Sequence, residues 1–242
     1  MKCIIVSLAS RPDRGGFMSS QESLANCSLF PAAVVDEAGE ARFRRRSWVA
    51  ADAMNFSRSQ KRNLLGLLES HLRVLDHFHA AQPPPRALLV FEDDAQVSTA
   101  AFAFIRELLD IDWSGTPWDV IRLKFQNFDN FAENYQNAFR AKVLAKQYRS
   151  RVLDADVYCY SAQTTDRSTH NLLYRGSSLG RVAASLRKAA LTSFDSMLLR
   201  ASKSSTDGFS SLYCVVRSPT HLITHIPWML RSSIATAADS EG

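Results

Sequence analysis

The sequence predicts an α/β protein of the Rossmann-like type, with a mainly parallel sheet flanked by helices. Short apolar runs alternate with longer segments in which apolar residues recur every three or four positions. This β-α-β-α-β order is typical of parallel sheets, because parallel neighbours need a crossover connection. The 242 residues, 46% of them hydrophobic, suffice for one domain with a sizeable core. We therefore expect one domain over residues 1–234 and a disordered tail over 235–242.

The individual elements are predicted from periodicity and from turn residues. Leu64, Leu68, Leu75 and Phe78 share one helical face, and Pro83 to Pro85 end that helix before an apolar run. The expected elements in chain order are a strand at 2–8, a helix-strand unit at 17–36, a helix at 58–80, a strand at 88–91, a helix from Ser98 or Thr99 to 110, a strand at 118–123, strands at 157–160 and 172–174, a helix at 179–190, a short helix from Ser193 and a strand at 212–216.

Three consecutive carboxylates, Glu92, Asp93 and Asp94, follow the apolar run at 88–91. In open α/β sheets, ligands gather at the carboxyl ends of the strands, which is where these acids are expected. Adjacent negative charges repel one another, and a hard divalent cation bridging to phosphate oxygens is a common solution. A solvated acidic turn is the alternative interpretation.

The loop after the first strand carries Arg11 and Arg14. Guanidinium groups bind phosphate oxygens well, and a strand-to-helix loop is a frequent place for them. The alternative is a basic turn stabilised by Asp13. Glycines follow the arginines in this loop, so the sequence matches neither the Walker pattern nor the GxGxxG fingerprint.

Two further polar residues fall at informative positions on predicted helices. His71 lies on the inward face of the helix at 58–80, as either a core histidine bonded to a backbone carbonyl or a contact beneath the acidic strand end. Asp195 lies in the first turn of a short apolar helix. There an acid can stabilise the helix dipole or act as a general base towards an acceptor hydroxyl.

The segment at 125–148 has Phe128, Phe131, Tyr135 and Phe139 at helical spacing among asparagines. Such a stripe is typical of core packing. Exposed aromatic and amide groups also bind sugar rings and their hydroxyls, so an acceptor surface is the functional alternative.

The formal charge of +5 favours an anionic partner, although the basic residues are dispersed. No arginine-rich helix or basic-aromatic platform is present, which disfavours nucleic-acid binding. No run approaches the roughly 20 apolar residues of a membrane span, so at most peripheral membrane contact is expected. Cys3, Cys159 and Cys214 fall in strand-like runs and indicate buried thiols, which favours a reducing compartment and a cytoplasmic location.

Several of these motifs, in this order and spacing, resemble those of glycosyltransferase family 25, the lipooligosaccharide galactosyltransferase family that includes collagen galactosyltransferase domains. The similar segments are Ser7 to Arg14, Gly66 to Leu72 with its Gly-x-x-x-Ser-His pattern, Val90 to Asp94, Trp118 to Val120, Tyr174 to Leu186, Asp195 to Leu198, and Pro219 to His225 with Ser232 to Ile234. The chain departs from the family at Leu67, Glu69 and Leu64-Leu65, where a cysteine, an apolar residue and an acid are usual.

The resemblance implies a GT-A fold and the transfer of a hexose, galactose above all, from a UDP-sugar to a hydroxyl of a glycan or glycoconjugate, with inversion. Asp94, assisted by Glu92 or Asp93, would hold Mn2+ or Mg2+, and His225 would complete the metal shell or donate to the leaving diphosphate. Asp195 would be the catalytic base with Asp156 in reserve. Donor binding would involve Ser7, Arg11, Arg14, His71 and Asp93. A non-catalytic member that binds a nucleotide sugar or a partner through the same pocket is the alternative.

Overall fold

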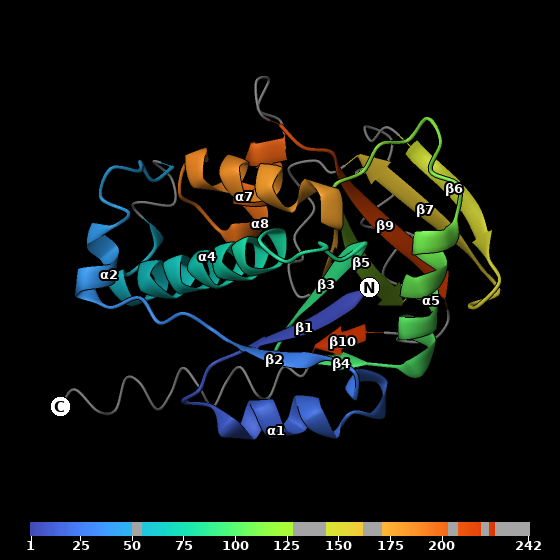
Figure 1. The fold of residues 1–242 in the computed structure, drawn as a ribbon, viewed down its shortest axis with the longest axis horizontal. Coiled ribbons are helices and arrows are strands. Elements are labelled where there is room, and N and C mark those ends of the chain that lie inside the picture. Colours follow the sequence, from blue (N-terminus) through green and yellow to red (C-terminus); the bar gives the residue numbers. More distant parts are fainter. Residues whose placement is uncertain (50–54, 128–143, 162–170, 203–207, 219–222, 226–242) are drawn as a thin grey trace.

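The fold is a mixed eight-stranded sheet covered by helices on both faces, in the strand order β2-β1-β3-β8-β5-β9-β7-β6 (Figure 1). It is given by a computed structural model that describes residues 1–49, 55–127, 144–161, 171–202, 208–218 and 223–225. The strands of this sheet are β1 (Lys2–Ser7), β2 (Ser28–Pro31), β3 (Ala87–Glu92), β5 (Val120–Asn127), β6 (Leu144–Ser150), β7 (Ala155–Ser161), β8 (Asn171–Arg175) and β9 (Ser211–Ser218). The α/β class and the mainly parallel sheet are thus confirmed.

The strand that ends in the acids, β3, lies inside the sheet between β1 and β8. β1 pairs in parallel with both β2 and β3, and β5 pairs in parallel with β9. β8 lies between β3 and β5 and is antiparallel to both, so β3 and β5 point the same way. A separate two-stranded antiparallel sheet joins β4 (Ala95–Val97) to β10 (Ile223–His225) directly after the acids. The carboxyl ends of β1, β3 and β5 consequently share one edge.

The helices form a layer on each face of the sheet (Figure 1). One layer holds α4 (Arg58–His79), α7 (Leu179–Lys188) and α8 (Phe194–Ser202), and the other holds α1 (Pro12–Ser20) and α5 (Thr99–Asp110). Three short helices, η1 (Glu22–Leu24), α2 (Glu37–Ala41) and η3 (Gly176–Ser178), lie in the connections. α4 begins at a capping box of Ser57 and Gln60, and Ser98 caps α5.

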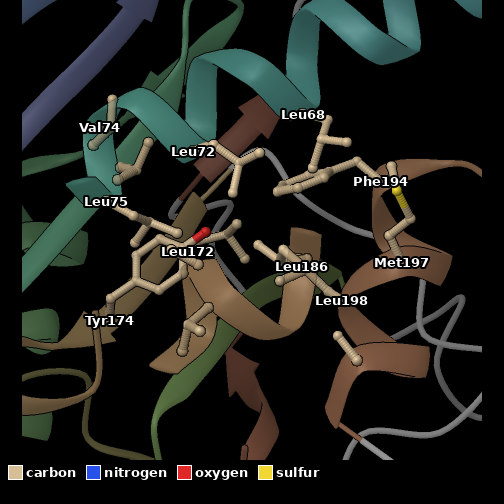
Figure 2. Close-up of a cluster of buried hydrophobic side chains, with 14 of the residues drawn as sticks. Leu68, Leu72, Val74, Leu75, Leu172, Tyr174, Leu186, Phe194, Met197 and Leu198 are labelled. Atoms are coloured by element: carbon tan, nitrogen blue, oxygen red, sulfur yellow. The ribbon is translucent and has the colours of Figure 1, made fainter. Parts of the chain in front are cut away.

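Each face of the sheet has its own hydrophobic cluster, because successive side chains of a strand point to opposite faces. Figure 2 shows the cluster under α4, where Leu68, Leu72 and Leu75 pack towards α7, α8 and β8. Leu68 and Leu75 are fully buried, as the helical periodicity predicts. Within the described residues, no helix has the length and apolarity needed to cross a membrane.

The cysteines differ from the prediction. Cys3 is disulfide-bonded to Cys27, and Cys159 to Cys214, so the expectation of buried free thiols is wrong. Cys159 and Cys214 face each other on the paired strands β7 and β9, a proximity that only the sheet register reveals. Disulfides persist mainly in oxidising compartments. The cysteines therefore no longer support a reducing compartment.

Several sequence predictions fall outside the described residues. These are the aromatic stripe from Phe128 to Phe139 and the tail at 235–242. For Asp195 and His225 the structure describes the backbone, in α8 and β10, and leaves the side chains outside the description.

We expect removal of the cross-strand disulfide to destabilise the fold. Replacing both Cys159 and Cys214 by serine removes a covalent bond between residues that are 55 positions apart. The free energy of unfolding should fall by about 2–4 kcal/mol in an unreduced denaturant titration. Thiol titration of the denatured, unreduced wild-type protein should detect no free thiol. After reduction it should detect four. Detection of four free thiols before reduction would contradict both disulfides.

Candidate functional site

The acidic residues form the turn between β3 and β4 at the carboxyl edge of the sheet. β3 ends at Glu92, which pairs in register with Val6 of β1, so Ser7 ends the neighbouring strand beside the acids. Asp93 and Asp94 are only 7% and 5% exposed. The solvated acidic turn that the sequence left open is therefore not what the structure contains.

Asp93 is held by three donors from the end of β1 and from α1. Its Oδ2 accepts hydrogen bonds from the Ser7 hydroxyl at 2.9 Å and from the Leu8 backbone N–H at 3.4 Å. Its Oδ1 accepts a hydrogen bond from the Arg14 guanidinium at 3.0 Å, and both side chains of this ion pair are about nine-tenths buried. Three of the five predicted donor-binding residues are thus brought together, since Ser7 and Arg14 both bind Asp93.

Arg11 lines a neighbouring cavity. It forms two hydrogen bonds with Asp13, at 3.0 and 2.8 Å, and this contact lowers the pKa of Asp13 to about 2. The basic turn that the sequence offered as an alternative therefore exists at this position. The cavity, of about 510 Å3, is lined by the β1-α1 loop, the first turns of α1 and the end of β2, including Ser7, Arg11 and Gly16.

The chain after Asp94 is fixed on both sides of β4. The amide of Gln21 donates to the Ala95 carbonyl at 2.9 Å and its oxygen accepts from the Val97 N–H at 2.8 Å, as a neighbouring strand would. On the other side β10 pairs with β4, and His225 is the register partner of Ala95. The backbone of His225 is therefore brought beside the residue that follows Asp94.

The described side chains do not complete a metal site. Among the residues whose side chains the structure describes, no three histidine, cysteine, aspartate or glutamate groups cluster closely enough to hold a metal ion. Asp94 and Glu92 supply the hard oxygen ligands that Mn2+ and Mg2+ prefer, and the strand pairing adds the backbone of His225 nearby. The donor set present on the chain is thus compatible in chemistry with such an ion.

His71 lies beneath this edge and is fully buried. A hydrogen bond of 3.3 Å joins its Nδ1 to the Tyr174 hydroxyl, and its ring stacks on Phe194 with the centroids 4.3 Å apart. Burial lowers the pKa of His71 to about 4 and outweighs the opposing effect of the negative charge on Glu92. The imidazole is therefore neutral at pH 7, and its hydroxyl partner replaces the backbone carbonyl that the sequence suggested.

Arg122 is a charged residue that the sequence analysis did not single out. It lies on β5 in register with Leu172 of β8 and is fully buried. Burial raises the pKa of Tyr174, while the charges of Arg122 and Glu92 act on it in opposite directions. The sequence signal for this residue is a single arginine within the apolar run Val120 to Leu123. A charged side chain is buried in a strand only when an opposite charge or hydrogen bonds compensate it.

The two candidate bases lie on different elements. Asp195 is the second residue of α8, and its neighbour Phe194 stacks on His71, so the start of α8 lies next to the layer beneath the acids. Asp156 lies on β7, where it pairs with Arg149 at 3.4 Å near the far edge of the sheet. The structure thus separates Asp156 from the acidic turn, which leaves Asp195 as the better candidate.

The Gly-x-x-x-Ser-His pattern of α4 has a packing explanation. A Cβ atom at Gly66 would lie 2.8 Å from the Ala33 carbonyl oxygen, so a larger residue would push the chain after β2 away. The Ser70 hydroxyl accepts from the Ala33 N–H at 2.8 Å and donates to the Gly66 carbonyl at 2.7 Å. Gly66 and Ser70 therefore hold the segment after β2 against α4. His71, the next residue of α4, is buried towards the sheet.

Asp119 is a further buried carboxylate, at the amino-terminal end of β5. It accepts hydrogen bonds from the Arg181 guanidinium at 2.5 Å, from the Ser210 backbone N–H at 2.7 Å and from the Ser178 hydroxyl. It thereby ties α7 and the start of β9 to β5, at the opposite edge from the acidic turn.

Comparison with known proteins adds no family to this description, since no protein-family model matches the chain and no curated protein matches it.

We expect Asp93→Ala to destabilise the fold strongly. The substitution leaves the buried Arg14 guanidinium without its carboxylate, which should cost about 3–5 kcal/mol in urea unfolding. Asp13→Ala is the matched control, because it removes the exposed carboxylate that pairs with Arg11 in the same loop, and it should change stability little. Equal losses in the two variants would contradict the anchoring role of Asp93.

His71 should make stability depend on pH below neutrality. Its pKa is about 4 in the folded state and near 6.5 when unfolded, so the unfolded chain binds more protons between these values. Stability should be full above pH 6.5 and fall as the pH drops towards 4, by roughly 3 kcal/mol.

The measurement is the free energy of unfolding from pH 8 to 4 for the wild type, for His71→Phe and for the exposed control His79→Gln. The loss should persist in the control and shrink in His71→Phe. An NMR titration in which the His71 ring protonates near pH 6.5 would contradict the burial argument.

Proposed function

We propose that the chain is a metal-dependent glycosyltransferase of the GT-A type, which moves a hexose from a nucleotide sugar to a hydroxyl of a glycan or glycoconjugate. The observation that carries the proposal is the buried Asp94 at the carboxyl end of β3, one residue before the point where β10 aligns His225 with Ala95. An interior parallel strand that ends in buried acids, beside a cavity at the end of β1, is a suitable place for a diphosphate and its cation.

The cavity at the end of β1 is the proposed site of the nucleotide. Its volume of about 510 Å3 lies within the usual range for small-molecule pockets. A Cβ atom at Gly16 would meet nothing within 4 Å, so this wall of the cavity is open. Arg11 lines the cavity and is partly exposed, which allows its guanidinium to turn from Asp13 towards a phosphate. UDP is the nucleotide and galactose the sugar that the family resemblance implies.

Asp94, Glu92 and His225 are the proposed ligands of Mn2+ or Mg2+. When bound, the cation would offset the negative charge that develops on the leaving diphosphate. Asp93 would hold the acidic turn in place without binding the ion itself, since both of its carboxylate oxygens already accept hydrogen bonds from Ser7, Leu8 and Arg14. His71 would stay neutral beneath the site and would fix the position of α8 through Phe194.

Asp195 is the proposed general base. In an inverting transfer, the acceptor hydroxyl oxygen attacks the anomeric carbon, the bond from that carbon to the diphosphate oxygen breaks, and the hydroxyl proton passes to the carboxylate. The position of Asp195 next to Phe194 supports this role, because Phe194 stacks on His71 below the acidic edge.

A second candidate function is the binding of a nucleotide sugar or partner without catalysis. It is supported by the cavity at the end of β1, which can take a ligand without a metal. A binding protein needs the cavity, whereas an enzyme also needs the acids to hold a metal.

We expect Asp94→Asn to reduce Mn2+-dependent release of UDP from UDP-galactose on the order of 100-fold, because the amide has lost the charge that binds the cation. The measurement is UDP release with and without Mn2+, on protein whose thermal unfolding matches that of the wild type. Asp154→Asn, on the exposed turn between β6 and β7, is the matched control and should keep full activity.

Full activity in Asp94→Asn would overturn the metal assignment. UDP-galactose binding by calorimetry, without release of UDP from any UDP-sugar, would instead support the binding function.

A further inference from the structure

A second cavity lies at the amino-terminal end of β1, the opposite end of the strand from the acidic turn. Its volume is about 740 Å3, within the range of small-molecule pockets. It arises because β2 is offset along the sheet and pairs with β1 only from Ile4 onward. Lys2 and Cys3 therefore line an open space that α4 and α5 approach from the two faces of the sheet.

Aromatic rings from three elements line this cavity. Phe30 comes from β2, Phe78 from the last turn of α4 and Phe102 from α5. His77 joins the first two, with its ring centroid 6.0 Å from that of Phe30 and 4.9 Å from that of Phe78. Rings placed edge to face in this way offer a surface for a flat apolar group.

The charged lining residues are mainly cations. Arg86 pairs with Asp110 at 3.2 Å, so the charge of this carboxylate is offset within the cavity wall. Lys2 and Arg106 are both exposed and supply the excess positive charge. The Arg106 guanidinium lies over the Phe102 ring, 5.9 Å from its centroid, so a cation and an aromatic ring are in contact in the cavity wall.

We propose that this cavity binds a small organic anion composed of an aromatic body and a terminal acidic group. The rings of Phe30, Phe78 and Phe102 take the aromatic body, and Lys2 and Arg106 take the acidic group. This site goes beyond the proposed transferase activity, since it needs neither a metal nor a nucleotide.

The proposed anion site and the nucleotide cavity are neighbours with separate charges. Both are lined by Leu29 and Phe30 of β2. Ser7 and Arg11 line only the nucleotide cavity, and Lys2 and Arg106 line only the anion site. Substitutions of these cations therefore distinguish the two.

Two fluorescent probes that differ by one charge test the proposal on the full chain. 8-Anilinonaphthalene-1-sulfonate carries the acidic group, and N-phenyl-1-naphthylamine is its neutral counterpart. The sulfonate should bind at one site per chain and about tenfold more tightly than the neutral probe. Lys2→Glu and Arg106→Glu should each weaken sulfonate binding about tenfold and leave the neutral probe unchanged, since two units of charge change near the anion.

Two further variants complete the set. Arg45→Glu makes the same charge change on an exposed residue after α2 and should leave both affinities unchanged. Ser28→Trp fills the cavity from β2 and should weaken both probes. Circular dichroism melting confirms that each variant is folded.

Three results would overturn the proposal. These are equal affinity for the two probes in the wild type, undiminished sulfonate binding in Lys2→Glu and Arg106→Glu, and displacement of the sulfonate by UDP with Mn2+. The last would place the probe at the acidic edge. Failure of UDP to bind at all bears only on the transferase proposal.

Discussion

The carboxylate of Asp93 is the interaction on which the carboxyl edge of the sheet depends. It joins the turn after β3 to the end of β1 through Ser7 and Leu8, and to α1 through Arg14. A buried carboxylate is tolerated only when it is paired and hydrogen-bonded, so these segments are constrained to one arrangement. The same engagement leaves Asp93 little capacity to bind a cation. The two acids therefore have different roles: Asp93 holds the edge of the sheet together, and Asp94 is the proposed metal ligand.

His71, in the layer beneath that edge, adds no positive charge near the acids at pH 7. A protonated histidine there would repel a cation, but burial against Phe194 keeps the His71 ring neutral in spite of the nearby Glu92. Arg122, which is fully buried on β5, adds a positive charge that acts on Tyr174 in the same region. Because its guanidinium is always charged, its effect on the site does not vary with pH in the physiological range. The charge that His71 and Arg122 contribute beneath the edge is therefore constant near neutrality.

Local patterns predicted the elements well, and contacts between distant residues explain what they missed. The helix expected at 58–80 is Arg58–His79, since both its periodicity and its capping box are local signals. The acidic turn was placed correctly because a strand end can be read from a few residues. The pairing of Asp93 with Arg14, 79 positions apart, and of Cys159 with Cys214 depends on strand order and register, which no short pattern encodes. The reversed direction of β8 is missed for the same reason.

The two ends of β1 lie beside charged residues of different sign. The excess of five positive charges is dispersed in sequence, yet the carboxyl end of β3 gathers Glu92, Asp93 and Asp94. The cations Lys2 and Arg106 meet at the amino-terminal end of β1, where the offset of β2 leaves room. Residues at opposite ends of a six-residue strand are roughly 17–20 Å apart, about two Debye lengths at physiological salt. Each end of β1 therefore keeps its own electrostatic potential. The proposed metal-dependent site at the carboxyl end and the proposed anion site at the amino-terminal end consequently do not share charged residues.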